Sequence, residues 1–455
     1  MQLLAIVPGI WAIIVAFSKS PEAAFVNVYI PVLLCLPDYY RWVAPGLPDP
    51  SFSHAAILPV TLVFLLKNGL KWKFSLGDLL VLGYASCVGY SEFSNAGYAE
   101  AQNLMFDMVC LVLLPYALTK ALVEPKGMRV EFAKKLVMCL FLISVISVYE
   151  FKFASTPWRM VLDGFFPGQG AGWVTTFRWG FARIAGPFGH AILAGTILTI
   201  GFRIQRWLEW SGHWEPQFRK FTLPIPKSRA ITLGIAAGIF MTMVRGPWIG
   251  GVLAAGIAMI GRAKNRARAA AAVASAMVVI GVPAGVVFYK YASVGRANAK
   301  TAAQESAAYR KELIDKYVDV AVARSVWGWG RNTWPRVDGM PSIDNFYLLL
   351  AIMHGLPALA CLLGVIFVTP IRLFFFEMKC PPVGPPGSSI GFTLISIYVA
   401  IGWTIATVYL GAQLMPLLFV ITGWAEGYML SGRRTLAEAP SQVFQPLFRF
   451  QRTIA

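Results

Sequence analysis

The stretch that decides the fold runs from Trp327 to Leu363 and reads WGWGRNTWPRVDGMPSIDNFYLLLAIMHGLPALACLL. An aromatic, Gly-rich segment leads into Asp344 and Asn345, and an apolar run then continues to about Pro370. Because about 20 apolar residues are enough to cross a bilayer, this run predicts a membrane-spanning helix. Asp344 and Asn345 are therefore expected where a polar loop enters the membrane.

The composition extends this interpretation to the whole chain. Hydrophobic residues make up 57% of the 455 residues and charged residues 14%, with a mean hydropathy of +0.61. A soluble domain of this size could not shield so much apolar surface from water. The chain is predicted to be an all-α, polytopic integral membrane protein, a single membrane domain over residues 1–455. Apolar windows predict 12 to 13 transmembrane helices, with a re-entrant segment left open among the first three: 3–18, 22–36, 54–67, 76–91, 101–123, 133–151, 184–205, 228–244, 246–261, 269–290, 345–370, 388–410 and 411–431.

The distribution of positive charge predicts the orientation. Of the 40 Lys and Arg residues, 25 fall on one side when the loops are assigned alternately. The other side has 15, of which nine belong to the long hydrophilic loop 291–343 when Lys290 is counted with it, and charge in so long a loop has little influence on topology. This bias places the long loop outside the cytoplasm and the C-terminus inside it. The net charge of +18 is thus a signal for topology and lipid headgroups, and nucleic acid is not expected as a partner.

Two similar motifs, each with an Arg shortly before a Gly-Pro pair, lie at predicted outer ends of spans. One span opens with Arg183, followed by Gly186-Pro187, and Arg245-Gly-Pro247-Trp248 lies in a later hairpin. Pro favours the first helical position, so each helix is expected to start at its Pro, with free N–H groups and an Arg beside them. This arrangement suits a diphosphate. The alternative is that Arg183 and Arg245 anchor helix ends to lipid headgroups. Two such motifs on one side, together with Arg310, Arg324 and Arg331 in the long loop, favour the diphosphate.

At this point the motifs carry a resemblance. Arg183-x-x-Gly-Pro-Phe, Val-Arg245-Gly-Pro-Trp248, a loop with Tyr-Arg310 and Trp-Gly-Trp-Gly330, and Asp344-Asn345-x-Tyr347 follow one another in order. Over residues 180–431 the chain resembles the O-antigen ligase and polysaccharide polymerase family. The resemblance implies a helical membrane glycosyltransferase of GT-C-like type. Such enzymes move glycan from undecaprenyl diphosphate to a hydroxyl acceptor on a glycan or lipid, without metal or cofactor, beside the polysaccharide export machinery. They work at the outer face of the bacterial inner membrane, so the resemblance implies that the long loop is periplasmic and the C-terminus cytoplasmic.

The resemblance also implies roles for individual residues. Arg183 and Arg245 match the two diphosphate-holding Args. Arg310 matches a loop Arg, and Arg331, Asn345, Tyr347 and Trp248 are expected to bind substrate. Where ligases have His before Asn-x-Tyr, this chain has Asp344, which favours the exopolysaccharide polymerase-like members. A carboxylate can accept the proton of a sugar hydroxyl, so Asp344 is the expected base.

Purely structural explanations remain open for several of these residues. Asp344 could be only an N-cap of the helix that it precedes. His354 is expected to be a packed core histidine, although many family members have Glu at its position. Four carboxylates near span ends, those of Asp78, Glu92, Glu100 and Asp107, are expected to snorkel or cap. The six cysteines show no CxxC spacing, so no metal site or disulfide is predicted.

A different class, a carrier-lipid or glycan transporter, would also be basic and polytopic. It is expected to show repeat symmetry and ionisable residues near the membrane midplane. Neither feature is evident, because the two halves show no clear repeat and the cations gather at predicted outer ends. The motifs therefore favour a glycosyltransferase.

Overall fold

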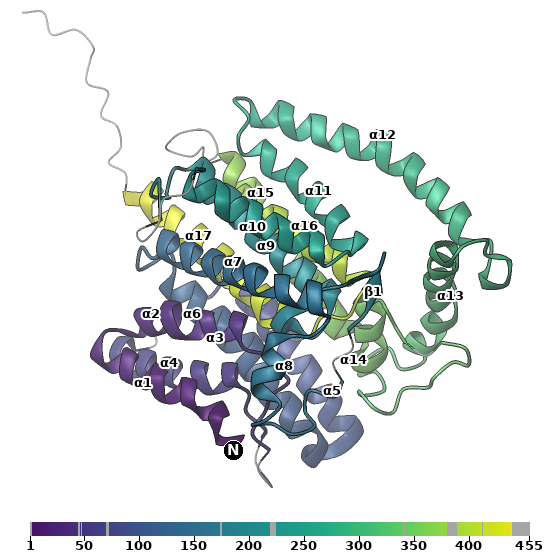
Figure 1. Ribbon diagram of the computed structural model, residues 1–455, viewed down its shortest axis with the longest axis horizontal. Coiled ribbons are helices and arrows are strands. Elements are labelled where there is room, and N and C mark those ends of the chain that lie inside the picture. The colour runs from purple at the N-terminus through teal and green to yellow at the C-terminus, as the bar shows by residue number, and fades with distance from the viewer. Residues whose placement is uncertain are drawn as a thin grey trace, which may run out of the picture.

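The computed structural model describes residues 2–43, 46, 48–69, 72–172, 175–218, 224–340, 342–379, 389–411 and 413–438. Besides loops, these residues form helices and one two-residue antiparallel strand pair (Figure 1). Cys380 and the basic residues beyond 438 lie outside them. The elements are η1 Gln2–Ile6, α1 Val7–Ser18, α2 Pro21–Ala24, η2 Phe25–Tyr29, α3 Ile30–Cys35, α4 Phe52–Asn68, α5 Leu76–Asp107, η3 Met108–Leu113, α6 Leu114–Leu122, α7 Arg129–Phe153, α8 Pro157–Leu162, β1 Phe177–Arg178, β2 Phe181–Ala182, η4 Gly186–Phe188, α9 Ala191–Trp210, α10 Lys227–Met241, α11 Arg245–Ile260, α12 Arg266–Ala292, η5 Arg296–Asn298, α13 Ala302–Ala323, α14 Phe346–Leu363, η6 Gly364–Val368, α15 Thr369–Lys379, α16 Gly391–Ile405 and α17 Leu414–Glu438.

The predicted class is confirmed. Each of the thirteen apolar windows falls mainly on helix. Within the described residues, five helical stretches are long and apolar enough to cross a membrane, and five shorter apolar helices accompany them. The long stretches are Leu76–Leu122, Arg129–Phe153, Arg266–Ala292, Phe346–Lys379 and Leu414–Gly432. The protein is therefore an all-α, multi-pass membrane protein.

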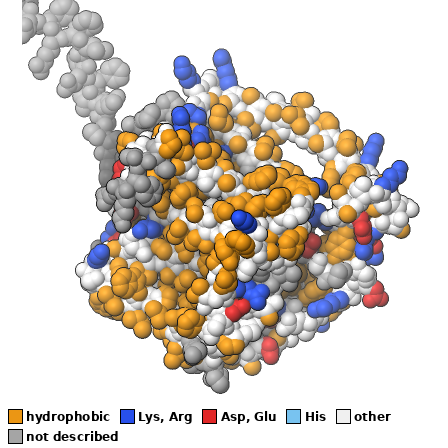
Figure 2. All heavy atoms as spheres, viewed as in Figure 1, with side chains coloured by type: hydrophobic (Ala, Val, Ile, Leu, Met, Phe, Trp, Pro, Cys, Tyr) orange, Lys and Arg blue, Asp and Glu red, His pale blue; other side chains and the backbone are white. Residues whose placement is uncertain are grey.

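The helices differ in how far they are covered by protein. Helix α11 packs on α16, α6 on α17, and α5 on α14, around fully buried side chains such as Trp207 and Trp424. Helix α12 is the exception, because none of its most apolar stretch is buried, and it arches away from the bundle in Figure 1. Hydrophobic side chains cover much of the visible face in Figure 2. Such a surface is expected where lipid chains are the solvent.

Three of the four carboxylates near span ends are ion-paired, which corrects the expectation that they only snorkel or cap. Asp78 lies 2.6 Å from the ammonium group of Lys120, and both side chains are less than 10% exposed. Asp107 pairs with Arg41, and Glu92 pairs with Arg331. Asp78 also accepts a hydrogen bond from the backbone N–H of Ser75, so it does cap α5. Buried charges require such partners, and the partners come from distant parts of the chain.

A break in α14 fixes the long loop to the bundle. Gly355 has φ 81° inside the helix, a left-handed value that suits Gly. The loop supplies the backbone bonds that the break leaves open: Leu356 N–H donates to Ser325 O (2.7 Å), Trp329 N–H to Ile352 O (2.9 Å) and Gly330 N–H to Met353 O (2.8 Å). Loop and helix approach so closely that a Cβ on Gly355 would collide with the Val326 carbonyl.

The long loop 291–343 contains a helix, as expected, because α13 occupies 22 of its residues. Leu313, Tyr317 and Ala321 on one face of α13 are buried with Ile343 and Ile352. Helix α13 therefore packs on the start of α14, where Asp344 lies. In Figure 1 the loop and α13 form a lobe that joins the far end of α12 to α14.

Candidate active site

The segment from Arg178 to Ile184 closes the end of α10. The last carbonyls of a helix have no partner within the helix. Here Ile184 N–H donates to Met241 O (3.3 Å), Arg183 Nε to Thr242 O (3.2 Å) and Arg178 Nη1 to Met243 O (2.6 Å). This contact holds Arg183 against the turn between α10 and α11.

The N–H groups expected to bind an anion near Pro187 are already used. The carboxylate of Glu150, near the end of α7, accepts hydrogen bonds from the N–H groups of Ala185 and Gly186, each at 2.9 Å. A 3-10 turn forms at Gly186–Phe188, and the α-helix begins only at Ala191. The expected helix start at Pro187 is therefore wrong, and the sequence could not show that a carboxylate from α7 would fill this place.

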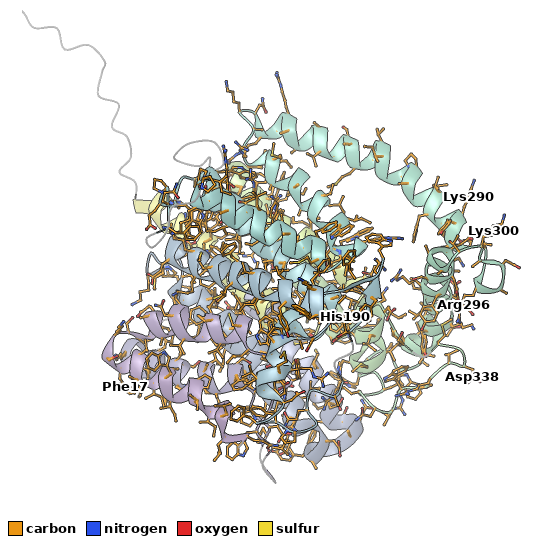
Figure 3. The ribbon with its side chains drawn as sticks, viewed as in Figure 1. Phe17, His190, Lys290, Arg296, Lys300 and Asp338 are labelled. Carbon is orange, nitrogen blue, oxygen red and sulfur yellow. The ribbon has the colours of Figure 1, made fainter. Side chains whose placement is uncertain are left out.

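His190 is the residue that sequence reasoning left without a role. It is the N-cap of α9, and its Nδ1 accepts a hydrogen bond from Ile192 N–H at 3.2 Å (Figure 3). Burial and the positive charge of Arg183 lower the pKa of His190, while the negative charge of Asp344 opposes this shift. Arg183 and Asp344 thus both influence the pKa of the same imidazole, in opposite directions. The signal in the sequence was the N-cap position directly before an apolar run.

Arg245 lies at the other end of the same turn. It is the first residue of α11 and is exposed, and its N-cap Val244 offers no side-chain acceptor. The α11 N–H groups near Arg245 therefore have no side-chain cap, in contrast to those of Ala185 and Gly186. Thr242, which binds Arg183, is only three residues away.

Positive charge gathers at this turn without a carboxylate partner. Burial and the neighbouring charge of Arg178 lower the pKa of Arg183. In the described part of the chain, Arg178, Arg183 and Arg245 form no ion pair with Asp or Glu. Cations held together in this way suit a dianionic ligand.

Asn345, and not Asp344, caps α14. The Asn345 side-chain oxygen accepts from Leu348 N–H at 3.2 Å. Asp344 accepts a hydrogen bond from the Ser342 hydroxyl at 3.2 Å. The hydroxyl of Tyr309 in α13 donates to Ser342 O (2.5 Å) and accepts from Ser342 N–H (3.2 Å). The capping alternative for Asp344 is therefore wrong, and its carboxylate is half-buried at the edge of the lobe.

Arg310 lies on the face of α13 that packs on α14. It is three and seven residues before the buried Leu313 and Tyr317, a spacing that puts all three on one face. The Arg310 Nε is buried without a hydrogen-bond partner among the described residues. Its guanidinium thus keeps donor capacity on the face of α13 that packs on α14.

The other predicted binding residues are engaged by protein. The Tyr347 hydroxyl donates to Gly402 O at 3.0 Å, and Trp248 Nε1 donates to Ile239 O at 3.1 Å. Arg331 donates to Glu92 through its backbone N–H and through Nε, each at 3.0 Å. These contacts hold segments of the protein together, and they use the Tyr347 hydroxyl, the Trp248 N–H and the Arg331 Nε donor.

The fold and this site define a multi-pass helical membrane protein with a cluster of Arg, His and Asp side chains at one set of helix ends. Residues 230–363 match the O-antigen ligase family model. The match confirms the resemblance drawn from the motifs, and it supports glycan transfer of the O-antigen ligase or polymerase type. It includes Arg245, Arg310 and Asp344, whereas Arg183 and His190 precede it. No curated protein matches the chain.

Proposed function

We propose that the protein transfers glycan from undecaprenyl diphosphate to a hydroxyl acceptor at the periplasmic face of the inner membrane. The observation that carries the proposal is the placement of Arg183 and Arg245 on the two sides of the α10–α11 turn, together with the His190 imidazole, whose pKa both Arg183 and Asp344 influence. Arg183 and Arg245 supply positive charge, which stabilises the diphosphate of a lipid-linked donor. Asp344 supplies a carboxylate, which can take the proton of a hydroxyl acceptor.

Each group has a separate part in the reaction. The acceptor oxygen bonds to the anomeric carbon and gives its proton to the Asp344 carboxylate. The bond from that carbon to the diphosphate oxygen breaks, and the diphosphate leaves with the electron pair. Arg183 and Arg245 stabilise the charge that develops on the leaving oxygen, so that no metal is required for this role.

His190 adds a donor to this arrangement. Because Nδ1 accepts a hydrogen bond, the neutral imidazole carries its proton on Nε2. The lowered pKa keeps the ring neutral near pH 7. His190 therefore presents one N–H donor, suited to a phosphate or sugar oxygen beside Arg183.

The test compares variants of Asp344. Asp344→Asn removes the proton-accepting charge and leaves the cap at Asn345 untouched, so transfer should fall by about 10²-fold or more with unchanged stability. Asp344→His restores a proton acceptor and should recover part of the activity. The assay follows surface polysaccharide and carrier-linked glycan in a strain lacking the chromosomal copy. Wild-type polymer output from Asp344→Asn would refute the assigned role.

A further inference from the structure

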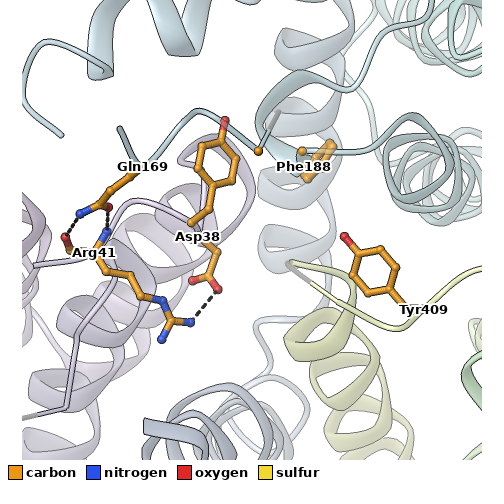
Figure 4. A pocket seen from close by; sticks show the side chains of 8 residues that line it. Asp38, Arg41, Gln169, Phe188 and Tyr409 are labelled. Atoms are coloured by element: carbon orange, nitrogen blue, oxygen red, sulfur yellow. Dashed lines mark hydrogen bonds and ion pairs between the residues drawn. The ribbon is translucent and has the colours of Figure 1, made fainter. Parts of the chain in front are cut away.

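A cavity of about 490 Å³ adjoins the candidate active site (Figure 4). Phe188 and Gly189, which directly precede His190, form one wall. The other walls come from the segment after α3, from the loop that contains Gln169 and from Tyr409 between α16 and α17. Gln413 ties these walls together, because its amide donates to Leu36 O at 2.9 Å and to Pro187 O at 3.1 Å. The proposed function uses none of the side chains that line this cavity.

The polar groups of the cavity are held in place by hydrogen bonds to other parts of the protein. Asp38 accepts from the hydroxyls of Ser51 (2.6 Å) and Ser53 (2.9 Å). The Gln169 side chain accepts from Arg41 N–H (2.7 Å) and donates to Arg41 O (2.9 Å). A ligand that meets such groups loses little binding energy to ordering the protein.

The cavity carries no net positive charge, in contrast to the α10–α11 turn. Arg41 Nη1 lies 3.0 Å from Asp107, and Arg41 Nη2 lies 3.7 Å from Asp38. A cation with two carboxylates beside it is a poor receptor for phosphate. Hydrogen-bonding groups with no net positive charge instead suit an uncharged ligand that has many hydroxyls.

The remaining surface suits the same ligand. Tyr409 exposes 44% of its surface, and Figure 4 shows its ring facing the space across from Asp38. An aromatic ring offers an apolar face and a polar tip to one ligand. The volume lies within the range of roughly 300–1,000 Å³ that is typical of small-molecule sites.

We propose that this cavity is a glycan subsite that holds one uncharged sugar residue next to the reacting centre. The assignment rests on the proposed function. The sugar belongs either to the chain on the diphosphate donor or to the hydroxyl acceptor, and both present the same chemistry to Asp38, Arg41 and Tyr409. The subsite would set which glycan is accepted, whereas the Arg cluster recognises the diphosphate common to all donors.

Gly172 allows the cavity to be filled without disturbing its polar network. It lines the cavity, and a Cβ there would meet no atom within 4 Å. Gly172→Leu should therefore fold and occupy the space. Gly164 in the same loop is equally open but does not line the cavity, so Gly164→Leu is the matched control.

The first measurement is binding. The probe is a set of oligosaccharides obtained by partial acid hydrolysis of the wild-type surface polysaccharide, observed by NMR with the full-length protein in nanodiscs. Wild type and Gly164→Leu should bind, while Gly172→Leu and Tyr409→Ala should bind at least about tenfold more weakly. No binding to wild type, or equal binding to both Leu variants, overturns the subsite.

The second measurement is transfer, with donor and acceptor varied separately. Gly172→Leu should raise the KM for only one of them by about tenfold, and that substrate is the source of the sugar. Unchanged KM values for both substrates overturn the subsite while the proposed function stands. Absence of transfer by wild type instead overturns the proposed function, and the binding measurement then decides the subsite alone.

Discussion

At the scale of single residues, Arg183 and Arg245 differ in what holds them. Arg183 donates to Thr242 O and closes the end of α10, whereas Arg245 is exposed and has no carboxylate partner among the described residues. Substitution of Arg183 should therefore affect both the structure and the site, whereas substitution of Arg245 should affect the site alone. The two Args can be separated by measuring stability and turnover on the same variants.

We expect Arg245→Ala to change the free energy of unfolding by less than about 0.5 kcal/mol and to lower transfer by about 10²-fold. Arg183→Ala should lower transfer as strongly and also cost about 1 kcal/mol of stability, because Thr242 O loses a charged donor. The Lys variants of both residues keep the charge but lose the planar fork, so they should remain folded and weakly active.

Thermal unfolding in detergent measures the effect on stability, and polymer output measures the effect on transfer. Full output from Arg245→Lys would make this Arg a headgroup anchor.

His190 makes stability depend on pH. Its lowered pKa means that the folded protein favours the neutral ring, whereas the unfolded chain has the ordinary value of about 6.5. As pH falls below about 6.5, the unfolded state binds a proton that the folded state resists, so stability present above that pH is lost on acidification. His190→Asn keeps an N-cap acceptor without this titration. Between pH 7.5 and 5.5 the wild-type Tm should fall further than that of His190→Asn, and equal falls would contradict the assignment.

The sequence was informative about residues whose role is local and less so about those with distant partners. Asp344 and Asn345 were placed correctly at a helix entrance, but which of them caps α14 depends on side-chain geometry within two residues. Glu150 lies 35 residues from Ala185, and Glu92 lies 239 residues from Arg331. No periodicity or spacing in one sequence encodes such pairs. The positions of Arg183 and Arg245 near helix ends were therefore predictable, while the carboxylates paired with distant segments, such as Glu150 and Glu92, were not.

At the scale of elements, the break in α14 joins the long loop to the membrane domain. The backbone around Gly328 in the loop packs directly against the backbone around Gly355 in α14. A Cβ on Gly328 would lie 2.5 Å from Met353 O. Ser91 in α5 supports the junction by donating to Trp327 O at 2.5 Å and lies 3.2 Å from Nδ1 of His354. His354 is 4% exposed there, which agrees with its expected place in the core.

This junction predicts a large difference between two Gly-to-Ala changes. Gly355→Ala must adopt φ 81° and ψ 175°, a backbone region essentially restricted to Gly, at about 1–3 kcal/mol. It must also push the Val326 carbonyl away, so a loss well above about 2 kcal/mol is expected. Gly281→Ala in α12 has open space around it and should stabilise the helix by roughly 0.5–1 kcal/mol. Thermal unfolding measures both changes. Similar Tm values for the two variants would mean that the loop does not pack into the break.

At the scale of the whole molecule, the segments around the site share one end of the bundle. The contacts of Arg41 with Asp107, Gln413 with Pro187 and Glu92 with Arg331 join loops that the alternating assignment placed on one side. Hydropathy and loop charge were sufficient for this arrangement, because a bilayer leaves the backbone few choices. Which face of the membrane this end occupies remains the prediction drawn from the 25 Lys and Arg residues on the other side.

Helix α12 offers a direct test of that prediction. Its 27 residues span about 40 Å at 1.5 Å per residue, enough to cross a bilayer, so exposed positions beyond its two ends must lie on opposite faces. Lys264 precedes α12, and Asn298 follows it. In a cysteine-free background, a membrane-impermeant maleimide should label Asn298→Cys in intact spheroplasts and should label Lys264→Cys only after permeabilisation. The reverse pattern would mean that the predicted membrane orientation is inverted. Labelling of both sites in intact spheroplasts would mean that α12 does not cross the membrane.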